Sequence, residues 1–238
     1  MTERIAKFMA RSGVCSRRQA EELIKQKRVT VDGQLIESPA FNVEGNEKIL
    51  LDGEKLPAAE HTRLWLYYKP VGLLTTHKDT ADRPTVFDNL PPEMPRVISV
   101  GRLDLNSEGL LLLTNSGELS RKLELPANSW SRRYKVRVHG KVELKKLAEL
   151  EKGAVIDGVQ YGKVKIELES QNGSNSWLLI TLNEGKNREI RKLMKYVGLE
   201  VARLIRLSYG PFQLGSLKKG EVREVPQKVL KEQLGDKI

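Results

Sequence analysis

The sequence predicts an α+β protein in two parts, a small N-terminal α/β unit followed by a largely antiparallel sheet with flanking helices. Helical spacing of apolar residues is confined to a few short segments, and many strand-like segments lie between turn signals. A length of 238 residues suits one large domain or two unequal ones. We expect the boundary after residue 60, which gives domains of residues 1–60 and 61–238.

The N-terminal unit is predicted to contain two short helices and then hairpins. Apolar residues at helical spacing after Thr2, a possible N-cap, indicate the first helix: Ile5, Phe8 and Met9. The second helix follows Ser16, which forms a capping-box pattern with Gln19. Asp-Gly pairs at residues 32–33 and 52–53 lie between apolar segments and predict hairpin turns.

The rest of the chain is predicted to consist mainly of strands. Segments of strand length and polarity occupy residues 64–68, 97–100, 110–113, 134–138, 164–168 and 177–182. One amphipathic helix is also indicated, because four apolar residues follow the i, i+3, i+4, i+7 pattern and Gly198 is a natural C-cap. These four residues are Ile190, Leu193, Met194 and Val197.

The charge of the chain indicates a polyanionic partner. Lysine and arginine number 41 against 31 acidic residues, which gives a net charge of +10 and a pI near 9.6. Residues 1–30 carry eight basic and three acidic side chains, whereas residues 31–60 carry two basic and seven acidic ones. Residues 121–238 contribute a further +11. Two separate basic regions favour two places of contact with nucleic acid, although ordinary solvated charge is the simpler alternative.

Several classes of protein are excluded by composition. The single cysteine, Cys15, rules out an internal disulfide and favours a reducing compartment, the cytoplasm. Three histidines and one cysteine leave no spacing for a zinc site, so we expect neither a metal nor a small-molecule cofactor. There is no run of about 18 apolar residues, and we expect no contact with a membrane.

The first basic region has the features of a phosphate-binding surface. Its candidate RNA-binding residues are Arg4, Lys7, Arg17, Arg18, Lys27 and Arg28. Arg17 and Arg18 fall in the first turn of the predicted second helix, where free N–H groups and the helix dipole favour an anion. Residues 4–7, 16–20 and 28–33 resemble the S-four domain, a small RNA-binding domain named after a ribosomal protein, over about residues 2–60. The resemblance implies that this surface binds structured RNA.

Residues 101–110 form a polar loop that leads into an apolar segment, and the loop contains a candidate catalytic carboxylate. Asp104 lies just past the predicted strand 97–100. In this position it is either a turn or capping residue or a catalytic group in a pocket. Glu108 would provide a second carboxylate, as in glycoside hydrolysis, but four residues across a glycine-containing loop fix no distance between the two.

The second basic region includes the outer face of the amphipathic helix. Arg188, Arg191, Lys192 and Lys195 repeat the apolar spacing two positions earlier, about 200° around a helix with 3.6 residues per turn. A stripe of four cations without an acid indicates contact with RNA or with a buried carboxylate. The alternative is an ordinary solvent-facing helix surface.

Five motifs occur in an order that resembles the bacterial pseudouridine synthases of the RsuA/RluB family. They lie at residues 69–72 (Lys-Pro-Val-Gly), 101–104 with 108–115, 133–134, 184–191, and 204–206 with 210–211. The match covers most of residues 62–226, behind the S-four-like domain. Small departures at Asn106, Ser107 and Ser116 do not affect the motif residues carried over as catalytic.

The resemblance implies the pseudouridine synthase fold and a cofactor-independent isomerisation of uridine in ribosomal RNA. It assigns Asp104 as the essential carboxylate, which attacks the anomeric carbon or removes a neighbouring ribose proton. It places Arg191 as the basic partner of Asp104, Tyr134 beside the base and Leu204 in the base pocket. The RNA-binding residues expected in this part of the chain are Arg102, Arg188, Lys192 and Lys195.

The expected partner is ribosomal RNA or an assembling ribosomal particle. Glu189 and the turn at residues 209–211 favour the branch that modifies large-subunit 23S rRNA over 16S rRNA. Two other functions stay open on the sequence alone: a non-catalytic RNA-binding or ribosome-assembly protein, and a hydrolase that uses Asp104 and Glu108.

Overall fold

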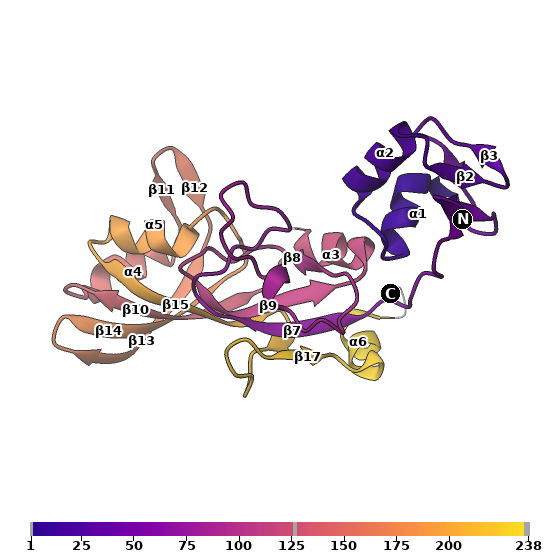
Figure 1. Cartoon of the computed structure of the whole chain (residues 1–238). Helices are drawn as coiled ribbons and strands as arrows, with labels where there is room; N and C mark the ends of the chain where they lie inside the picture. Colours follow the sequence, from indigo (N-terminus) through magenta and orange to yellow (C-terminus); the bar gives the residue numbers. More distant parts are fainter. Residues whose placement is uncertain (1, 126–127, 236–238) are drawn as a thin grey trace. The chain divides into compact units, whose positions relative to one another are not determined.

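The computed structural model describes residues 2–125 and 128–235, which form two compact units (Figure 1). The first unit comprises the chain up to Arg63 together with residues 93–98 and 114–117. The second comprises the remaining described residues and contains the large sheet. No helix in the described ranges is both long and apolar enough to cross a bilayer.

The first unit packs two helices against short strands. Its elements are β1 (Glu3–Arg4), α1 (Ile5–Arg11), α2 (Arg17–Lys25), β2 (Val29–Val31), β3 (Gln34–Leu35), β4 (Asn42–Val43), β5 (Ile49–Leu51) and β6 (Glu54–Lys55). The predicted capping box is confirmed, because the Ser16 hydroxyl accepts a hydrogen bond from the Gln19 N–H while the Gln19 side chain accepts one from the Ser16 N–H. The first helix begins at Ile5 and not directly after Thr2, since β1 pairs with β4.

The second unit is built on a sheet of nine strands within the described residues. The strands run in the order β13-β14-β10-β15-β9-β7-β17, with β16 beside β15 and β8 beside β9. The elements are β7 (Leu64–Lys69), η1 (Phe87–Asn89), β8 (Ile98–Val100), β9 (Glu108–Thr114), α3 (Gly117–Glu124), β10 (Arg132–His139), α4 (Leu144–Leu150), β11 (Ala154–Ile156), β12 (Val159–Tyr161), β13 (Val164–Asn172), β14 (Asn175–Leu182), α5 (Glu189–Tyr196), β15 (Glu200–Tyr209), β16 (Phe212–Gln213), β17 (Val222–Glu224) and α6 (Gln227–Leu234).

The pairing of these strands confirms the predicted fold class. β10 runs antiparallel to both β14 and β15, and β13 runs antiparallel to β14. β15 and β9 are parallel neighbours. The predicted strand 164–168 extends to Asn172, and most of its side chains are exposed because β13 is an edge strand.

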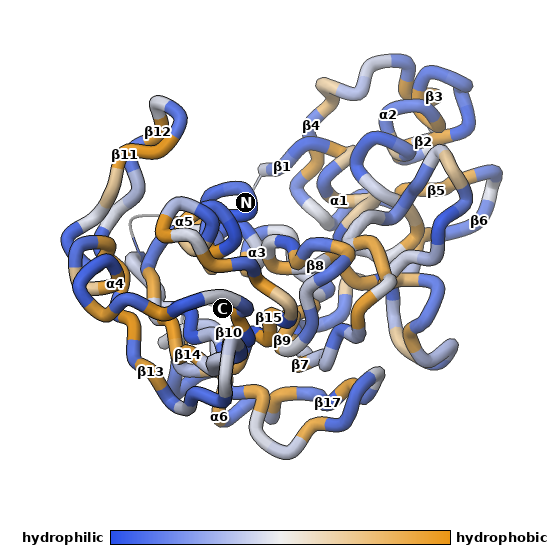
Figure 2. Tube along the Cα trace, turned by 90° about the vertical axis from the view of Figure 1, so that its left-hand side faces the viewer, coloured by the Kyte–Doolittle hydropathy of each residue, from blue (hydrophilic) through white to orange (hydrophobic). Residues whose placement is uncertain are grey.

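Two apolar cores cover the opposite faces of the sheet, and β15 contributes residues to both. Leu204 belongs to the core in which α4 and α5 pack on β10 and β14, whereas the adjacent Ile205 belongs to the core that includes α3 and α6. Successive residues of a strand point to opposite faces, so the alternation of β15 separates the two cores. Figure 2 shows apolar stretches of the chain in both units, among them the part around β9 and β15. The face that carries Leu204 also carries the site described next.

Candidate active site

A cavity of about 670 Å³ lies in the second unit. It is bounded mainly by the loops 101–107 and 182–188, the first turn of α5, and side chains of β10 and β15. The structure brings together the sequence-predicted site residues Asp104, Tyr134, Arg191 and Leu204, all of which line this cavity. Arg102 and Arg188 line it as well.

The loop that carries Asp104 is held by its backbone. Each of the five consecutive carbonyl groups of residues 103–107 accepts a hydrogen bond. The Thr75 hydroxyl donates to the first at 2.9 Å, the Gly72 N–H to the third at 2.9 Å and the Arg191 guanidinium to the fourth at 2.8 Å. Lys69 donates to the second at 3.1 Å and to the fifth at 2.9 Å. Fixed carbonyls give the loop one backbone conformation and so set the position of Asp104.

Lys69 is the least expected of these donors, because it is fully buried at the end of β7. Its ammonium group also donates to the Pro70 carbonyl at 3.0 Å, so all three of its N–H groups have carbonyl partners. Burial lowers the pKa of Lys69 to about 8, while the charges of Asp104 and Glu108 act in the opposite direction. Lys69 is not among the site residues that the sequence predicts. The signal was a lysine that closes an otherwise apolar and aromatic strand.

The nearest positive charge to the Asp104 carboxylate comes from Arg188, and not from Arg191 as expected. The Arg188 guanidinium lies 3.6 Å from the Asp104 carboxylate. This is the ion pair that Asp104 makes within the described ranges. Arg188 is the N-cap of α5 and has a left-handed backbone with φ of +52°. Arg191 instead donates to the carbonyls of Asn106 at 2.8 Å and Val201 at 3.1 Å. Burial and then the charge of Arg188 lower the pKa of Arg191, while Asp104 raises it. Both cations therefore act on Asp104, Arg188 by contact and Arg191 at longer range.

Tyr134 and Arg206 are neighbours across the β10–β15 pair, on the face that bounds the cavity. Tyr134 is 8% and Arg206 3% exposed. The Arg206 Nε donates to the Leu110 carbonyl at 2.7 Å. This close approach of β15 to β9 requires Gly109, because a Cβ there would lie 2.4 Å from the Arg206 carbonyl oxygen. Arg206 is thus a cavity residue that sequence reasoning missed.

Polar atoms without a protein partner are concentrated around the cavity. Five buried side-chain atoms among the described residues lack a hydrogen-bond partner, and four of them belong to cavity-lining residues. These four are Ser107 Oγ, Glu189 Oε1, Arg191 Nε and Arg206 Nη2. Because buried polar groups are normally paired, the cavity has the chemistry of a binding site for a polar ligand.

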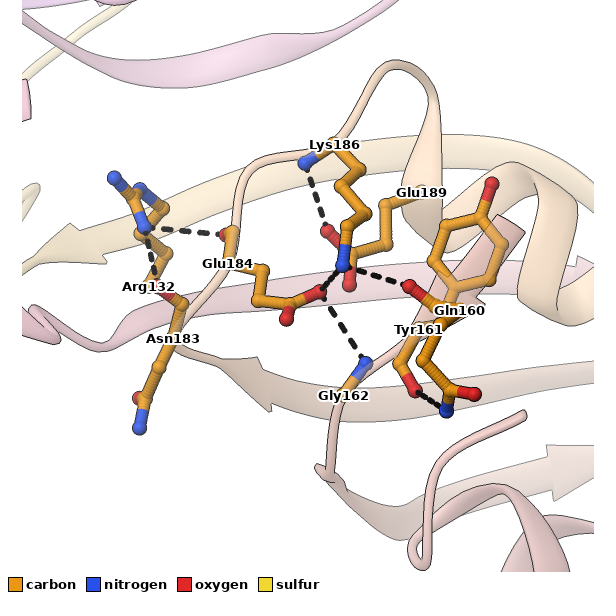
Figure 3. Close-up of polar contacts among 8 residues, drawn as sticks. All are labelled: Arg132, Gln160, Tyr161, Gly162, Asn183, Glu184, Lys186 and Glu189. Atoms are coloured by element: carbon orange, nitrogen blue, oxygen red, sulfur yellow. Dashed lines mark hydrogen bonds and ion pairs between the residues drawn. The ribbon is translucent and has the colours of Figure 1, made fainter. Parts of the chain in front are cut away.

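The opposite rim of the cavity is tied to the β11–β12 hairpin (Figure 3). Arg132 donates to the carbonyls of Asn183 and Glu184. The Lys186 ammonium contacts the Glu184 carboxylate and donates to the Gln160 carbonyl. Glu189 accepts a hydrogen bond from the Lys186 N–H, and burial raises the pKa of its carboxyl group. These contacts hold the segment that leads into Arg188.

Glu108 does not form a carboxylate pair with Asp104 at this site. It is not among the residues that line the cavity, and its carboxylate is bound by Arg203 at 2.6 Å and Lys219 at 3.0 Å. The Tyr68 hydroxyl donates a further hydrogen bond at 3.1 Å. Burial raises the pKa of Glu108, but these three partners outweigh it and lower the pKa below its usual value. A hydrolase that uses both carboxylates is therefore not supported.

The N-terminal basic residues divide into paired and unpaired cations. Lys7 lies 3.5 Å from Glu3, Lys27 2.7 Å from Glu37 and Arg28 2.5 Å from Asp52. Arg4, Arg17 and Arg18 are exposed and make no ion pair within the described ranges. The capping box already uses the N–H groups of Ser16 and Gln19, so an anion at this helix start would meet chiefly the two arginines.

Comparison with known proteins extends over nearly the whole chain. Residues 63–196 match the family described as RNA pseudouridylate synthase, and residues 3–49 match the S4 domain. A Rickettsia felis protein described as an uncharacterized RNA pseudouridine synthase is 51% identical, over 96% of this chain and 99% of that protein. A Yersinia pestis protein named ribosomal large subunit pseudouridine synthase B is 41% identical, over 90% of this chain and 69% of that protein. A crystal structure of a pseudouridylate synthase, 25% identical, gives a TM-score of 0.69 and covers 97% of this chain and 99% of that one.

Proposed function

The chain belongs to the RNA pseudouridylate synthase family, and from this premise we propose that it isomerises one specific uridine of ribosomal RNA to pseudouridine. The relatives named for the large ribosomal subunit support 23S rRNA, free or in an assembling particle, as the substrate. An rRNA substrate and a single cysteine are consistent with action in the cytoplasm. The same comparisons do not favour a non-catalytic RNA-binding protein.

The reaction rearranges bonds without oxidation. The bond between ribose C1′ and uracil N1 breaks, the uracil turns, and C1′ bonds to ring carbon C5. The proton on C5 is lost and N1 gains one, so atoms and electrons balance and no electron acceptor is needed. Asp104 starts the reaction either by attacking C1′ or by removing a ribose proton, and it performs both roles as a carboxylate.

The observation that carries this proposal is the convergence of Asp104, Tyr134 and two arginines on one cavity. The Arg188 guanidinium contacts the Asp104 carboxylate, and Arg191 lies in the same cavity, so both positive charges face the negative charge of Asp104. Tyr134 would stack on the uracil, a contact worth about 1–3 kcal/mol per base, and Leu204 would form the apolar wall. Arg102 at the cavity mouth is exposed and placed for a phosphate.

The target uridine must leave its stack to reach Asp104, which costs a few kcal/mol. Binding energy from elsewhere on the protein offsets this cost. We assign it to residues 1–60, chiefly Arg4, Arg17 and Arg18 with support from Lys7, Lys27 and Arg28, and to the outer face of α5. Catalysis then belongs to residues 61–238.

Replacement of Asp104 by Asn tests the proposal. Asp104→Asn keeps the shape of the loop but removes the carboxylate, so it is expected to bind rRNA with unchanged affinity and to form no pseudouridine. Product would be mapped in rRNA by carbodiimide modification and primer extension, with Asp82→Asn, an exposed loop position, as the matched control. Normal turnover by Asp104→Asn would exclude the mechanism, and release of free uracil by the wild type would indicate a hydrolase.

A further inference from the structure

The solvent face of α5 combines cations with one aromatic ring. Its exposed or half-buried positions beyond the cavity are Lys192, Lys195 and Tyr196, which follow Arg188 along the helix. Residues 188, 192 and 196 are spaced by four and lie in one row, while the opposite face packs in the core. The face carries no acidic residue, and neither lysine makes an ion pair in the part of the chain that the structure describes. The row begins at the Asp104 contact and leads away from the cavity.

Tyr196 ends this row beside a second cavity. Tyr196 is 61% exposed, and Val155 of β11 is 60% exposed. Both residues line a cavity of about 290 Å³ between α4, α5 and β11, together with Leu150 and Val197. Figure 1 shows the β11–β12 hairpin standing beside α5. A cavity with an aromatic side chain in its wall, and with both apolar and charged lining residues, therefore lies at the end of the row that carries Arg188 and Lys192.

We propose that this second cavity binds an unpaired nucleobase of the RNA near the target uridine, with the base stacked on Tyr196. This inference rests on the proposed function, since it requires an RNA substrate. Cations that hold phosphates and an aromatic ring that stacks on a base are the two components of single-stranded RNA binding. Glu149 and Lys146 also line the cavity, and Lys146 is paired with Glu143 at 2.9 Å. The carboxylate of Glu149 disfavours a phosphate inside, so the base enters and the phosphates lie along Lys192 and Lys195.

Crosslinking tests where RNA lies. Large-subunit rRNA transcribed with 4-thiouridine would be bound to the full-length protein, irradiated and digested, and the RNA-bearing tryptic peptides identified by mass spectrometry. We expect crosslinks on the peptide 196–203, which begins at Tyr196, or on 153–163, which contains Val155, in addition to 103–121, which contains Asp104. Crosslinks on 103–121 alone would overturn this inference and leave the proposed function intact. Absence of crosslinks on all three peptides would contradict both.

Binding measurements separate stacking from charge. Tyr196→Ala is expected to weaken binding of the same rRNA about tenfold without changing the salt dependence, whereas Tyr196→Phe, which keeps the ring, binds like the wild type. Lys192→Ala is expected to lower the salt slope by about 0.7–0.9. Equal affinities for Tyr196→Ala and Tyr196→Phe would overturn the stacking role. A wild-type dimer that Tyr196→Ala converts to a monomer would instead identify this face as an interface between two copies of the chain.

Discussion

The Asp104 loop and the N-terminal basic surface differ in how the protein holds them. Every carbonyl of residues 103–107 is bound, three of the five by the buried or half-buried side chains of Lys69 and Arg191. Arg17 and Arg18, by contrast, project from the first turn of α2 into solvent. Chemistry on one ribose needs a single backbone conformation, whereas binding of a long polyanion adds many weak contacts. A single substitution that disturbs the loop should therefore abolish activity, whereas a single substitution on the basic surface should lower RNA affinity only in part.

The largest effect is expected from Lys69→Met. The apolar side chain fills a similar volume but leaves the carbonyls of Pro70, Asp104 and Ser107 without this donor. The Asp104 carbonyl keeps its hydrogen bond from the Ser107 N–H, so the Pro70 and Ser107 carbonyls are the two left unpaired. At about 1–3 kcal/mol for each unpaired group, the variant should lose about 2–6 kcal/mol of unfolding free energy and its activity. Urea unfolding and pseudouridine mapping check both losses.

The unfolding free energy of the protein should depend on pH in a way that shows the burial of Lys69. Because the pKa of Lys69 is about 8 in the folded chain and near 10.5 when unfolded, the unfolded chain binds more protons between these values. The unfolding free energy of the wild type should therefore gain a rising contribution from pH 8 to 10.5, which Lys69→Met lacks. Lys228→Met, at an exposed position of α6, should behave like the wild type. Parallel pH profiles for Lys69→Met and wild type would contradict this account.

Gly109→Ala is expected to have the next largest effect. Gly109 follows the Asp104 loop in β9 and has a φ of +103°, which disfavours any residue with a side chain. The added Cβ would also collide with the backbone of Arg206 in β15. The two strands must separate, and we expect a loss of about 2–4 kcal/mol together with reduced activity.

Gly117→Ala is the matched control for Gly109→Ala. Its nearest contact would be at 4.0 Å, to the Ile98 side chain, and its φ is not positive. An equal stability of the two variants would show that the approach of β9 to β15 tolerates a side chain.

The sequence predicts much of this fold because local patterns decide its elements. The capping box at Ser16 and the amphipathic pattern of α5 depend on residues within one or two turns, and both are found. The motif around Asp104 correctly indicates a loop after a strand. The motifs also bring Asp104, Tyr134 and Arg191 to one cavity.

The partners of individual side chains are where sequence reasoning fails. Arg188 and Arg191 share one stripe, and only the left-handed N-cap at Arg188 directs that side chain to Asp104. Glu108 lies close to Asp104 in sequence, yet the start of β9 places it against Arg203 and Lys219. Lys69 lies 35 residues from Asp104, so no local pattern indicates their contact. The spacing of residues in the sequence determines which face of a helix or strand a side chain occupies. The register of the strands and the conformation of the loops determine which partner that side chain contacts.

The smallest effect is expected on the N-terminal surface, from Arg17→Ala. Loss of one exposed cation without an ion pair should weaken rRNA binding several-fold, lower the salt slope by about 0.7–0.9, and change stability by less than about 0.5 kcal/mol. Turnover of bound RNA should be unchanged, because the Asp104 loop does not depend on this residue.

Arg28→Ala is the matched control, since Arg28 is already paired with Asp52 and its loss should alter the salt slope less. Binding titrations at four or more salt concentrations give both slopes. If Arg17→Ala leaves the slope unchanged, or abolishes turnover of saturating RNA, the graded behaviour attributed to this surface is wrong, and with it the contrast to the anchored loop.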